Sequence, residues 1–586
     1  MFSETVLMPT LFLSHGLGHQ SRCRALARSL GCRILLPHNW LFSHFDQKSP
    51  MVKLPDIETL KKYWDGLPIL WSWEELQLKD WVLVDGFRTP QVLFQKLNSL
   101  KNPFVGWDEG GVYRRQFPFL VDTLPGTSFT KANVLRPELL DLPIQTPMRP
   151  FVSHQESKVL VVFGGGDPAH LTAPVLQLLL KHTSWKIDAI LGPLSSIENT
   201  LPQGITLLPP QERLVDQLGN YDLVITSWGL TMMESLQKGT PVLLCNPTTY
   251  HEALSRRWGL PSLGVGSPRN SRLSASLLKL NQTCNLARQY LPHQPTNPSD
   301  FWKNGMPSGH LCPVCGKVGQ VQHRMNHRTY FECKNCSMEF MHTFDLPPLS
   351  YSQEYFFESY QSQYGKTYLQ DFEHIQKLGQ ERIDFLWKTL GKAPKPSKVL
   401  DLGCAYGPFL SAAKARGLTV FGSDISSHAV SYVQKELGIQ AVEKPLESLD
   451  WNKDFGGEPP QWISLWYVIE HFTELESLRN FLLKTLPLGG LLSFSTPNAR
   501  GITRIFSKDR FWESSPQDHF TLWSPRRVSK VLGSWGFETL GIRMTGEHPE
   551  RFPGVEKSPK LLPWITLASR WFRWGETFEV YARRIQ

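Results

Sequence analysis

Four cysteines near the middle of the chain have the spacing of a zinc site. They form two C-x2-C pairs with 17 residues between them, in the segment CPVCGKVGQVQHRMNHRTYFECKNC. A separation of about 15–20 residues between two such pairs is typical of zinc-binding modules. A shell of four thiolates leaves no position for water. The sequence therefore predicts a structural zinc ion, rather than disulfides, bound by Cys312, Cys315, Cys333 and Cys336.

A second group of candidate residues lies in KVLDLGCAYGPFLSAAKARGLTVFGSDIS, where two apolar strands flank a glycine-rich turn and a helix. Asp401 ends the first strand, Gly403 and Gly407 lie in the turn, and Asp424 ends the second strand. We expect the two glycines to let a ligand approach the backbone. Asp424 can accept hydrogen bonds from both hydroxyls of a ribose, as an acid does there in dinucleotide-binding folds.

The turn departs from the nicotinamide fingerprint G-x-G-x-x-G, which seats a pyrophosphate at the helix N-terminus. Counted from Gly403, Ala405 stands at the second glycine position and Pro408 at the third. A carboxylate at Asp401 would face the ligand, which suits a cation and not a pyrophosphate. S-adenosylmethionine has a sulfonium, an ammonium group and no phosphate, so these residues favour it as the cofactor.

Residues 396–586 resemble the class I S-adenosylmethionine-dependent methyltransferases. The family's landmarks follow the glycine turn in order: QWISLWYVIEHF with its "EH" signature, LLKTLPLGGLLSFSTPN with its "L-x-P-G-G" turn, DHFTLWSPRRVSKVLGSWGFETLGI, and GETFEVYARR as the closing antiparallel strand. The resemblance implies a Rossmann-like domain of seven strands. It places His471 where substrate and cofactor meet and His519 in a late loop, with Glu447 in the adenine-binding region. His471 is expected either to act as a base or to shape the pocket.

The N-terminal half contains two more sets of strands followed by glycine turns. In LFLSHGLGHQSRCRALARSLG, the residues Gly16, Gly18 and His19 fall at a helix N-terminus, which is a position suited to an anion or a sugar. DWVLVDGF reads as a buried strand that ends at Asp85, and PFVGWDEGG as a strand that leads to Asp108. In SKVLVVFGGGDPAHLTAPVLQLLL, the run Gly164–Gly166, which includes Gly165, lies between strand and helix, where we expect it to face a diphosphate.

Residues 1–295 resemble the two-lobed (GT-B) nucleotide-sugar enzymes. The closest resemblance is to the UDP-sugar hydrolase of pseudaminic acid biosynthesis, and a more distant one is to the N-acetylglucosaminyltransferase of peptidoglycan assembly. The shared motifs are G-x-G-H, the "GG-D/S-P" loop and "(S/G)-G-x-T-x-x-E…G-x-P". The resemblance implies that His19 lies at the reacting end of the sugar. It also implies that Gly229 and Thr231 cap the diphosphate and that Glu234 binds the ribose hydroxyls.

Two departures from this family bear on the nucleotide-sugar site. The family's double glycine is Trp228-Gly229 in this chain, and we expect the indole to narrow or reorganise the phosphate loop. The asparagine-glutamine pair that often follows the next strand is replaced by TYHE at 249–252. The neighbouring methionines, Met232 and Met233, are expected in the core.

The order of the cysteine module, an "EYF" segment and the methyltransferase core resembles a bacterial group. It includes sugar C-methyltransferases of deoxysugar pathways and methyltransferases from surface-polysaccharide clusters. The resemblance implies that the four cysteines bind zinc and that the module helps to enclose the substrate. A further C-terminal domain found in the sugar C-methyltransferases has no clear match here, so O-, N- and C-methylation all remain open.

Length and composition place these segments in one α/β chain of 586 residues, with 41% hydrophobic and 20% charged residues and a net charge of +9 that is not concentrated in a basic block. The amphipathic pattern of YLQDFEHIQKLGQERIDFLWKTL predicts a helix. No apolar run reaches the length of about 18–20 residues that a helix needs to span a bilayer. We expect a cytoplasmic protein that does not bind nucleic acid. The predicted domains are GT-B-like lobes at 1–150 and 151–295, a zinc ribbon at 305–345, a helical linker or lid at 346–395, and a methyltransferase at 396–586.

Two hypotheses for function follow. In the first, the chain methylates a sugar or glycan, nucleotide-linked or lipid-linked, and its N-terminal half is a second enzyme of the glycosyltransferase or UDP-sugar hydrolase type. This activity would belong to bacterial surface-polysaccharide biosynthesis, in association with membrane-bound glycan assembly enzymes. In the second, only the methyltransferase reacts and the N-terminal half is a binding module. A small-molecule or protein acceptor is a further alternative.

Overall fold

The computed structural model describes the chain in two compact units. The first comprises 1–310, 323–329 and 343–346, and the second comprises 311–322, 330–342 and 347–586. The residues described are 5–12, 18–46, 54–86, 88–123, 131–140, 142–165, 167, 169–192, 201–211, 213–293, 301–302, 309–344, 365–546, 567 and 571–586. All statements below refer to these residues.

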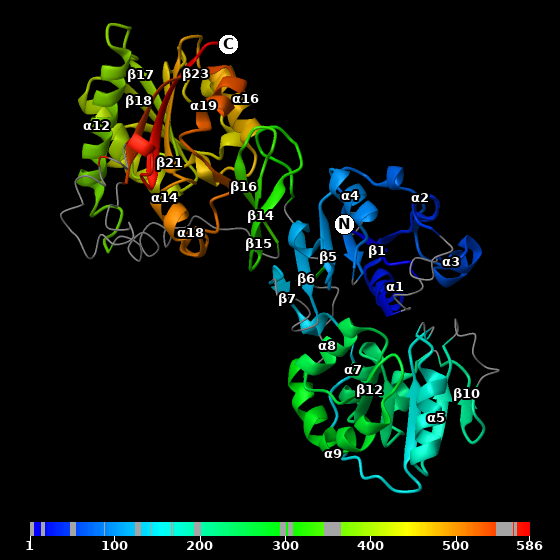
Figure 1. Ribbon diagram of the computed structural model, residues 1–586. Helices are drawn as coiled ribbons and strands as arrows, with labels where there is room; N and C mark the ends of the chain where they lie inside the picture. The colour runs from blue at the N-terminus through cyan, green and yellow to red at the C-terminus, as the bar shows by residue number, and fades with distance from the viewer. Residues whose placement is uncertain are drawn as a thin grey trace. The chain divides into compact units, whose positions relative to one another are not determined.

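The first unit begins with a parallel sheet of seven strands in the order β3-β2-β1-β4-β5-β6-β7 (Figure 1). The strands are β1 (Thr5–Pro9), β2 (Arg33–Leu35), β3 (Ile69–Leu70), β4 (Trp81–Asp85), β5 (Phe104–Trp107), β6 (Phe119–Asp122) and β7 (Val134–Leu135). The connecting helices are α1 (Gly18–Leu30), α2 (His38–His44), α3 (Ile57–Tyr63) and α4 (Gln91–Ser99). The strand order reverses between β1 and β4, and ligands of open α/β sheets bind at the carboxyl ends of strands flanking such a point.

A second parallel sheet in the same unit has the order β10-β9-β8-β11-β12-β13. Its strands are β8 (Lys158–Val162), β9 (Lys186–Ile190), β10 (Thr206–Leu208), β11 (Leu223–Thr226), β12 (Val242–Asn246) and β13 (Ser262–Val265). Its helices are α5 (Thr172–His182), α6 (Val215–Leu218), α7 (Leu230–Gln237), α8 (Thr249–Arg257) and α9 (Asn270–Ala287). Met232 and Met233 are buried in its core, as predicted.

The cysteine module contains a small sheet in the order β14-β15-β16-β22. Its strands are β14 (Gln320–Met325), β15 (Arg328–Glu332), β16 (Glu339–Thr343) and β22 (Thr521–Leu522). The last strand comes from the C-terminal part of the chain, because β16 pairs with β22 in antiparallel fashion.

The second unit contains a sheet of seven strands in the order β19-β18-β17-β20-β21-β24-β23. The strands are β17 (Lys398–Leu402), β18 (Thr419–Asp424), β19 (Gln440–Glu443), β20 (Trp462–Trp466), β21 (Leu491–Pro497), β23 (Phe537–Thr545) and β24 (Thr577–Arg584). The first five are parallel, and β24 is antiparallel to both β21 and β23. The predicted α/β class with a Rossmann-like methyltransferase fold is confirmed. The assignment of the N-terminal half to the GT-B class remains a prediction.

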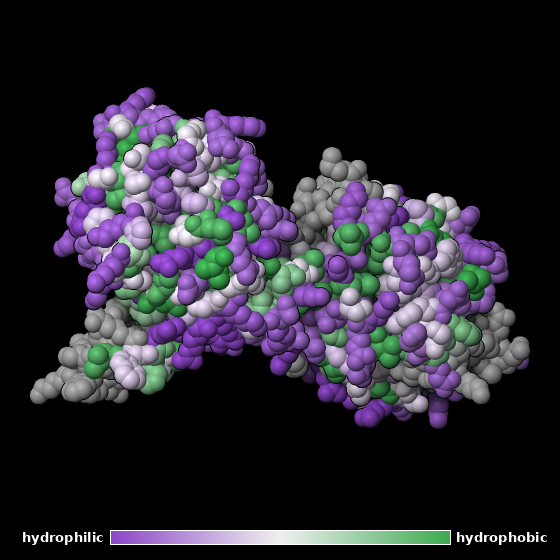
Figure 2. Space-filling model, turned by 90° about the horizontal axis from the view of Figure 1, so that it is seen from above, coloured by the Kyte–Doolittle hydropathy of each residue, from purple (hydrophilic) through white to green (hydrophobic). Residues whose placement is uncertain are grey.

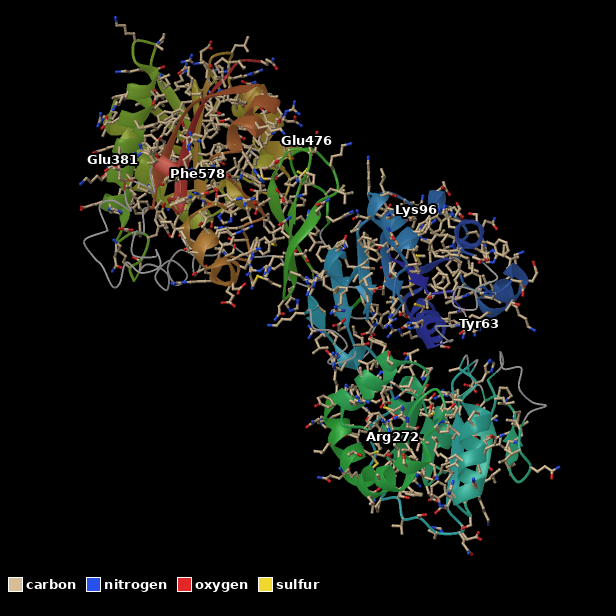
Figure 3. The ribbon with its side chains drawn as sticks, viewed as in Figure 1. Tyr63, Lys96, Arg272, Glu381, Glu476 and Phe578 are labelled. Atoms are coloured by element: carbon tan, nitrogen blue, oxygen red, sulfur yellow. The ribbon has the colours of Figure 1, made fainter. Side chains whose placement is uncertain are left out.

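Helices cover this sheet, and they are α12 (Phe372–Leu390), α13 (Pro408–Ala415), α14 (Ser427–Lys435), α15 (Trp451–Asp454), α16 (Leu475–Thr485), α17 (Ile502–Phe506), α18 (Lys508–Ser514) and α19 (Val528–Ser534). The predicted helix is α12, which buries Ile383 and Leu386 in the core that also contains Val399 of β17. A strand that is covered on both faces is expected to be apolar along nearly its whole length. Phe578 of β24 is fully buried, whereas Glu476 of α16 is exposed (Figure 3).

The face seen in Figure 2 is mostly hydrophilic, with hydrophobic residues scattered over it. Among the residues that the structure describes, no helix combines the length and the apolar character that a membrane crossing requires.

Candidate functional site

Two buried carboxylates lie at the carboxyl ends of neighbouring strands in the second unit. Asp401 of β17 is 2% exposed and accepts a hydrogen bond of 2.6 Å from Ser464 Oγ of β20. Burial raises the pKa of Asp401 to about 7, although Ser464 and Arg382 favour its charged form. Burial also raises the pKa of Asp424, at the end of β18. Among the residues that the structure describes, no cationic side chain forms an ion pair with either carboxylate, so a bound cation would stabilise their ionised forms.

The turn between β17 and α13 has a left-handed backbone at three positions. Gly403 has φ +68°, Ala405 φ +47° and Gly407 φ +75°. A Cβ on Gly403 would lie 2.5 Å from Val468 Cγ2, so this position has no room for a side chain. Asp424 holds the turn, because its carboxylate accepts the Ala405 N–H at 2.8 Å. The predicted cofactor residues Asp401, Gly403 and Asp424 therefore lie together around one turn.

Gly407 and Glu447 lie at the margins of this group. A Cβ on Gly407 would lie 2.9 Å from the side chains of Leu437 and Val433, so its conformation also serves packing against the next helix. Glu447 lies after β19, the third strand, and is exposed. Three residues before it, Lys444 donates its backbone N–H to the Asp424 carbonyl at 3.1 Å. Glu447 thus follows directly on a segment attached to the end of β18.

A cluster of two histidines and two acids lies beyond β20. His471 ends a short 3₁₀ helix (Ile469–His471), and its ring centroid lies 5.0 Å from that of His519. The ring Nδ1 of His471 lies 3.0 Å from the backbone carbonyl of Asp518 and 3.1 Å from the Asp518 carboxylate. Glu470 is 1% exposed. The two predicted histidines therefore do come together, and two acids that the sequence reasoning did not single out surround them.

The charges of this cluster are coupled. Burial raises the pKa of Glu470 to about 7, although the His471 imidazole opposes that shift. Burial of the His471 ring favours the neutral imidazole, but Asp518 and Glu470 outweigh it and raise the pKa of His471. The "EH" signature includes Glu470, so the sequence itself could have identified this acid as a candidate. Asp518 is 47 residues away from His471, and no local pattern links them.

The four cysteines converge on one point. The Sγ atoms of Cys312 and Cys336 are 3.4 Å apart, those of Cys315 and Cys333 are 3.4 Å apart, and those of Cys315 and Cys336 are 3.8 Å apart. All four are free thiols. Zn–S bonds of about 2.3 Å in a tetrahedral shell place sulfurs about 3.8 Å apart. The four-cysteine cluster thus fits a zinc ion, in agreement with the predicted ligand set.

The ribbon is joined to the loop that contains His519. The backbone N–H of Met341 donates to the Phe520 carbonyl at 2.7 Å. Glu339, at the start of β16, is 4% exposed and lies 2.9 Å from the Arg504 guanidinium. These bonds attach the metal-binding module to the segment that follows Asp518 and His519.

In the first unit, His19 belongs to a buried charged network at the carboxyl ends of β4 and β5. His19 Nδ1 lies 2.5 Å from Asp85 Oδ1. Arg22 donates to Asp85 at 2.6 Å and to Asp108 at 2.7 Å, and its guanidinium lies 4.1 Å from the centre of the Trp107 ring. Burial disfavours the charge on Asp85, but Arg22 and His19 outweigh it and hold the pKa of Asp85 at about 2. An ionised Asp85 fixes the His19 ring and directs its Nε2 away from the carboxylate.

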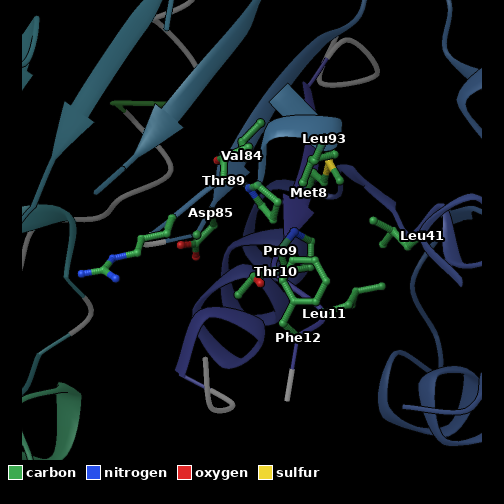
Figure 4. A pocket seen from close by; sticks show the side chains of 13 residues that line it. Met8, Pro9, Thr10, Leu11, Phe12, Leu41, Val84, Asp85, Thr89 and Leu93 are labelled. Atoms are coloured by element: carbon green, nitrogen blue, oxygen red, sulfur yellow. The ribbon is translucent and has the colours of Figure 1, made fainter. Parts of the chain in front are cut away.

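A pocket opens beside this network, between β1 and the segment that follows β4. Figure 4 shows Asp85 at its edge among mostly apolar side chains, which include Met8, Val84 and Leu93. Gly18 and His19 lie in the first turn of α1. Gly16, the other predicted residue of this loop, lies outside the described residues.

In the second sheet, the predicted diphosphate residues lie at strand ends. Gly229 is the N-cap of α7, Thr231 lies in its first turn, and Glu234 lies one turn further on. The expectation that Trp228 narrows or reorganises the phosphate loop stays a prediction; its indole is 3% exposed and packs edge-on against the Trp258 ring at 4.7 Å.

The glycine run after β8 contains Gly164, which is exposed, and Gly165, which is half-buried. Asp167 follows the run and caps α5 by accepting hydrogen bonds from the backbone N–H groups of Leu171 and Thr172.

The TYHE segment contributes two further residues that sequence reasoning noted only as a departure. Tyr250 lies under the Arg88 guanidinium, which is 5.1 Å from its ring centre. Burial lowers the pKa of His251 to about 4, and the nearby charges of Arg88 and His19 act in the same direction. His251 is thus a neutral imidazole in the electrostatic range of His19.

Comparisons with known proteins agree with the fold of the second unit. The sequence model of a family described as a methyltransferase domain matches residues 372–541. The C-terminal part of the chain therefore contains a methyltransferase domain.

A stretch of 102 residues is 34% identical to an uncharacterized protein of Methanocaldococcus jannaschii and covers 16% of this chain. The match spans only 21% of that relative's length. Among solved structures, a SAM-dependent methyltransferase from Archaeoglobus fulgidus is 15% identical, with 39% of this chain and 98% of that chain covered and a TM-score of 0.28. The magnesium protoporphyrin IX methyltransferase of Synechocystis PCC 6803 with bound SAH is 17% identical, with 40% and 97% covered and a TM-score of 0.27.

Proposed function

We propose that the C-terminal half of the chain transfers a methyl group from S-adenosylmethionine to a sugar or glycan. The observation that carries this proposal is the pair of buried carboxylates, Asp401 and Asp424, at neighbouring strand ends around a left-handed glycine turn. A cluster of imidazoles and acids after β20 supplies the polar groups for an acceptor.

The residues at the first position fit the cofactor. S-adenosylmethionine supplies an activated methyl group on a sulfonium centre. Asp401 would face its positively charged end, and a cation there would offset the burial that raises the pKa of this carboxyl to about 7. Both oxygens of Asp424 accept backbone N–H groups, from Ala405 and Ser426, and each retains a lone pair for a ribose hydroxyl. Glu447 would border the adenine.

The chain's own contribution is alignment of the acceptor. Methyl transfer is an in-line displacement, so most of the acceleration comes from holding the two reacting atoms in line. Asp518 orients the ring of His471, and His519 lies edge-on to it. A base is needed only for a hydroxyl or C–H acceptor, and these two histidines are the predicted catalytic residues.

The zinc ribbon supports a role at the acceptor side. Zinc held by four thiolates would be structural, since no ligand position stays open. Its strand β16 pairs with β22, directly after His519. The ribbon therefore positions the loop that presents His519, and this attachment is one reason to place it in the enzyme and not in a separate module.

The test is mass spectrometry of nucleotide sugars and lipid-linked glycans from cells that produce the chain or its Asp401→Asn variant. We expect one pool to be heavier by a methylene group with the parent chain and unchanged with the variant. The same glycan profile in both cultures would contradict a glycan acceptor.

A second candidate function concerns the first unit. We infer a nucleotide-sugar site there, because the buried Asp85 fixes His19 in the first turn of α1, directly after Gly18. Arg256, Arg269 and Arg272 line a pocket at the end of β13 (Figure 3 labels Arg272). Glu252 lines it too and pairs with Arg256 at 3.4 Å and with Arg272 at 3.2 Å, which leaves the four side chains with a net positive charge that suits a phosphate.

Turnover of a UDP-sugar distinguishes a second enzyme from a binding module. The assay uses the Asp401→Asn chain, so that methyl transfer does not interfere. Hydrolysis or transfer that disappears on His19→Ala indicates a second active site. Binding of the UDP-sugar without turnover favours the binding module, and absence of binding would contradict both.

A further inference from the structure

The two histidines after β20 form, with Glu470, a group that has the composition of an open metal site. One ligand atom from each of Glu470, His471 and His519 lies within 4.8 Å of the other two. Two imidazoles and one carboxylate are the ligands of catalytic zinc and of other divalent first-row metals. We propose that these three residues bind a divalent transition-metal ion, separate from the ion of the four cysteines.

The contact between His471 and Asp518 is the arrangement expected of a metal ligand. A histidine bound to a metal through one ring nitrogen almost always donates the other N–H to a carboxylate or a carbonyl. His471 Nδ1 lies 3.0 Å from the Asp518 carbonyl and 3.1 Å from its carboxylate. An ion bound through Nε2 would leave this Nδ1 contact in place. The same contact fixes the ring plane, so the ligand is oriented before the ion binds.

Glu470 gives an independent indication. Glu470 is 1% exposed, and its Oε2 makes no hydrogen bond of full geometry among the described residues, although the Thr496 hydroxyl lies near enough to favour its charged form. A buried carboxylate oxygen without a donor is costly, and native proteins normally satisfy such an atom with a partner or an ion. A cation between Glu470 and the two rings would satisfy it.

The three ligand atoms would have to move only slightly closer together to bind one ion. Metal–ligand bonds of about 2.1 Å place neighbouring ligand atoms about 3–4 Å apart. The His519 side chain is half-buried, and an ion would draw its nitrogen towards the other two ligands by a change of its side-chain torsions. His471 and Glu470 are adjacent in the chain and need not move.

The ion would have a different task from the ribbon zinc. Three protein ligands leave at least one coordination position open, whereas four thiolates leave none. An oxygen of the acceptor would fill the open position, so the ion would select acceptors that present a hydroxyl or two vicinal hydroxyls. This role rests on the proposed methyl transfer, but binding of the ion does not.

Zinc content of the purified full chain tests the proposal without methyl donor or acceptor. After loading with Zn²⁺ and removal of free metal, we expect two zinc ions per chain. His519→Ala and Glu470→Gln should each retain one. The matched control His428→Ala, which removes an exposed histidine on α14, should retain two. Asp518→Asn should weaken the second ion's binding by about 10- to 100-fold, the usual effect of losing an outer partner.

The zinc of the ribbon serves as an internal control for folding. A variant that keeps that ion and loses the other is folded and has lost a ligand. One zinc per parent chain would overturn the proposal, as would two zinc ions in both His519→Ala and Glu470→Gln. Failure of methyl transfer would leave these stoichiometries unchanged, so the two proposals fail separately. If the parent binds only one ion, His471 and His519 would contact the acceptor directly, without a metal.

Discussion

Replacement of Asp401 by asparagine should change both the affinity for S-adenosylmethionine and its pH dependence. The substitution keeps an acceptor for the Ser464 hydroxyl, which lies 2.6 Å from the carboxylate, and removes only the charge. Burial raises the pKa of Asp401 to about 7 in the free protein. A bound cation stabilises the ionised form, so binding below pH 7 requires loss of a proton.

The size of the effect follows from the pKa and from Coulomb's law. The dissociation constant of the parent chain should be flat above pH 8 and should rise about tenfold per unit below pH 7. Two unit charges about 4 Å apart interact by about 4 kcal/mol at an effective dielectric constant of about 20. If the amide dipole recovers half of this, the variant binds at least about 30-fold more weakly at pH 8. At pH 5 the parent carboxyl is protonated, and the two proteins should bind almost equally.

Isothermal titration calorimetry of the full chain at pH 5 to 9 measures this convergence. Adenosine, which carries neither cationic group, is the ligand control and should show no such dependence. Asp384→Asn, at an exposed position on the same unit, is the matched protein control. A parent affinity that does not change with pH, or equal affinities of parent and variant at pH 8, would refute the assignment of Asp401 to the cationic end of the cofactor.

Three further predictions concern other parts of the molecule. Asp85→Asn should lower the unfolding free energy of the first unit by about 1–3 kcal/mol, because the buried Arg22 loses one of its two carboxylate partners and keeps Asp108, while the exposed Asp65→Asn should change it little. In the parent, this contribution is present above pH 4 and is lost as pH falls towards 2, since the pKa of Asp85 is lowered to about 2. Denaturant titration measures both. Cys333→Ser should lose the ribbon zinc and slow methyl transfer, and normal turnover without that ion would show that the ribbon does not position the acceptor loop. Gly403→Ala should cost about 1–3 kcal/mol more than Gly417→Ala, because both have a left-handed backbone but only the first lacks space for a Cβ; equal thermal stability of the two variants would contradict this.

Local sequence patterns were sufficient to predict which residues lie at the ends of strands. A buried apolar run followed by an acid places the carboxylate at the edge of a parallel sheet, and this predicted the positions of Asp401 and Asp424 at the ends of β17 and β18. The cysteine spacing likewise predicted the four-thiolate cluster, since each pair is local and one hairpin joins the pairs. The roles assigned to these residues in ligand binding remain predictions.

Local sequence patterns could not predict contacts between residues that are far apart in the chain. Asp518 and His471 meet only because β16 and β22 pair and fix the loop between α18 and β22. His19 and Asp85 are 66 residues apart and meet because β1 and β4 are neighbours in the sheet. Trp228 is a related case, since its indole packs against Trp258, a contact that no local pattern indicated.

The most direct test of the central claim uses the purified chain with S-adenosylmethionine labelled by a trideuteromethyl group. The acceptors are a panel of nucleotide sugars and a lipid-linked glycan extract, and the products are read by mass spectrometry. We expect one sugar species to gain the labelled methyl group with the parent chain and not with Asp401→Asn. Label transferred only to a peptide or to a small molecule without a sugar, with none in any sugar species, would contradict it.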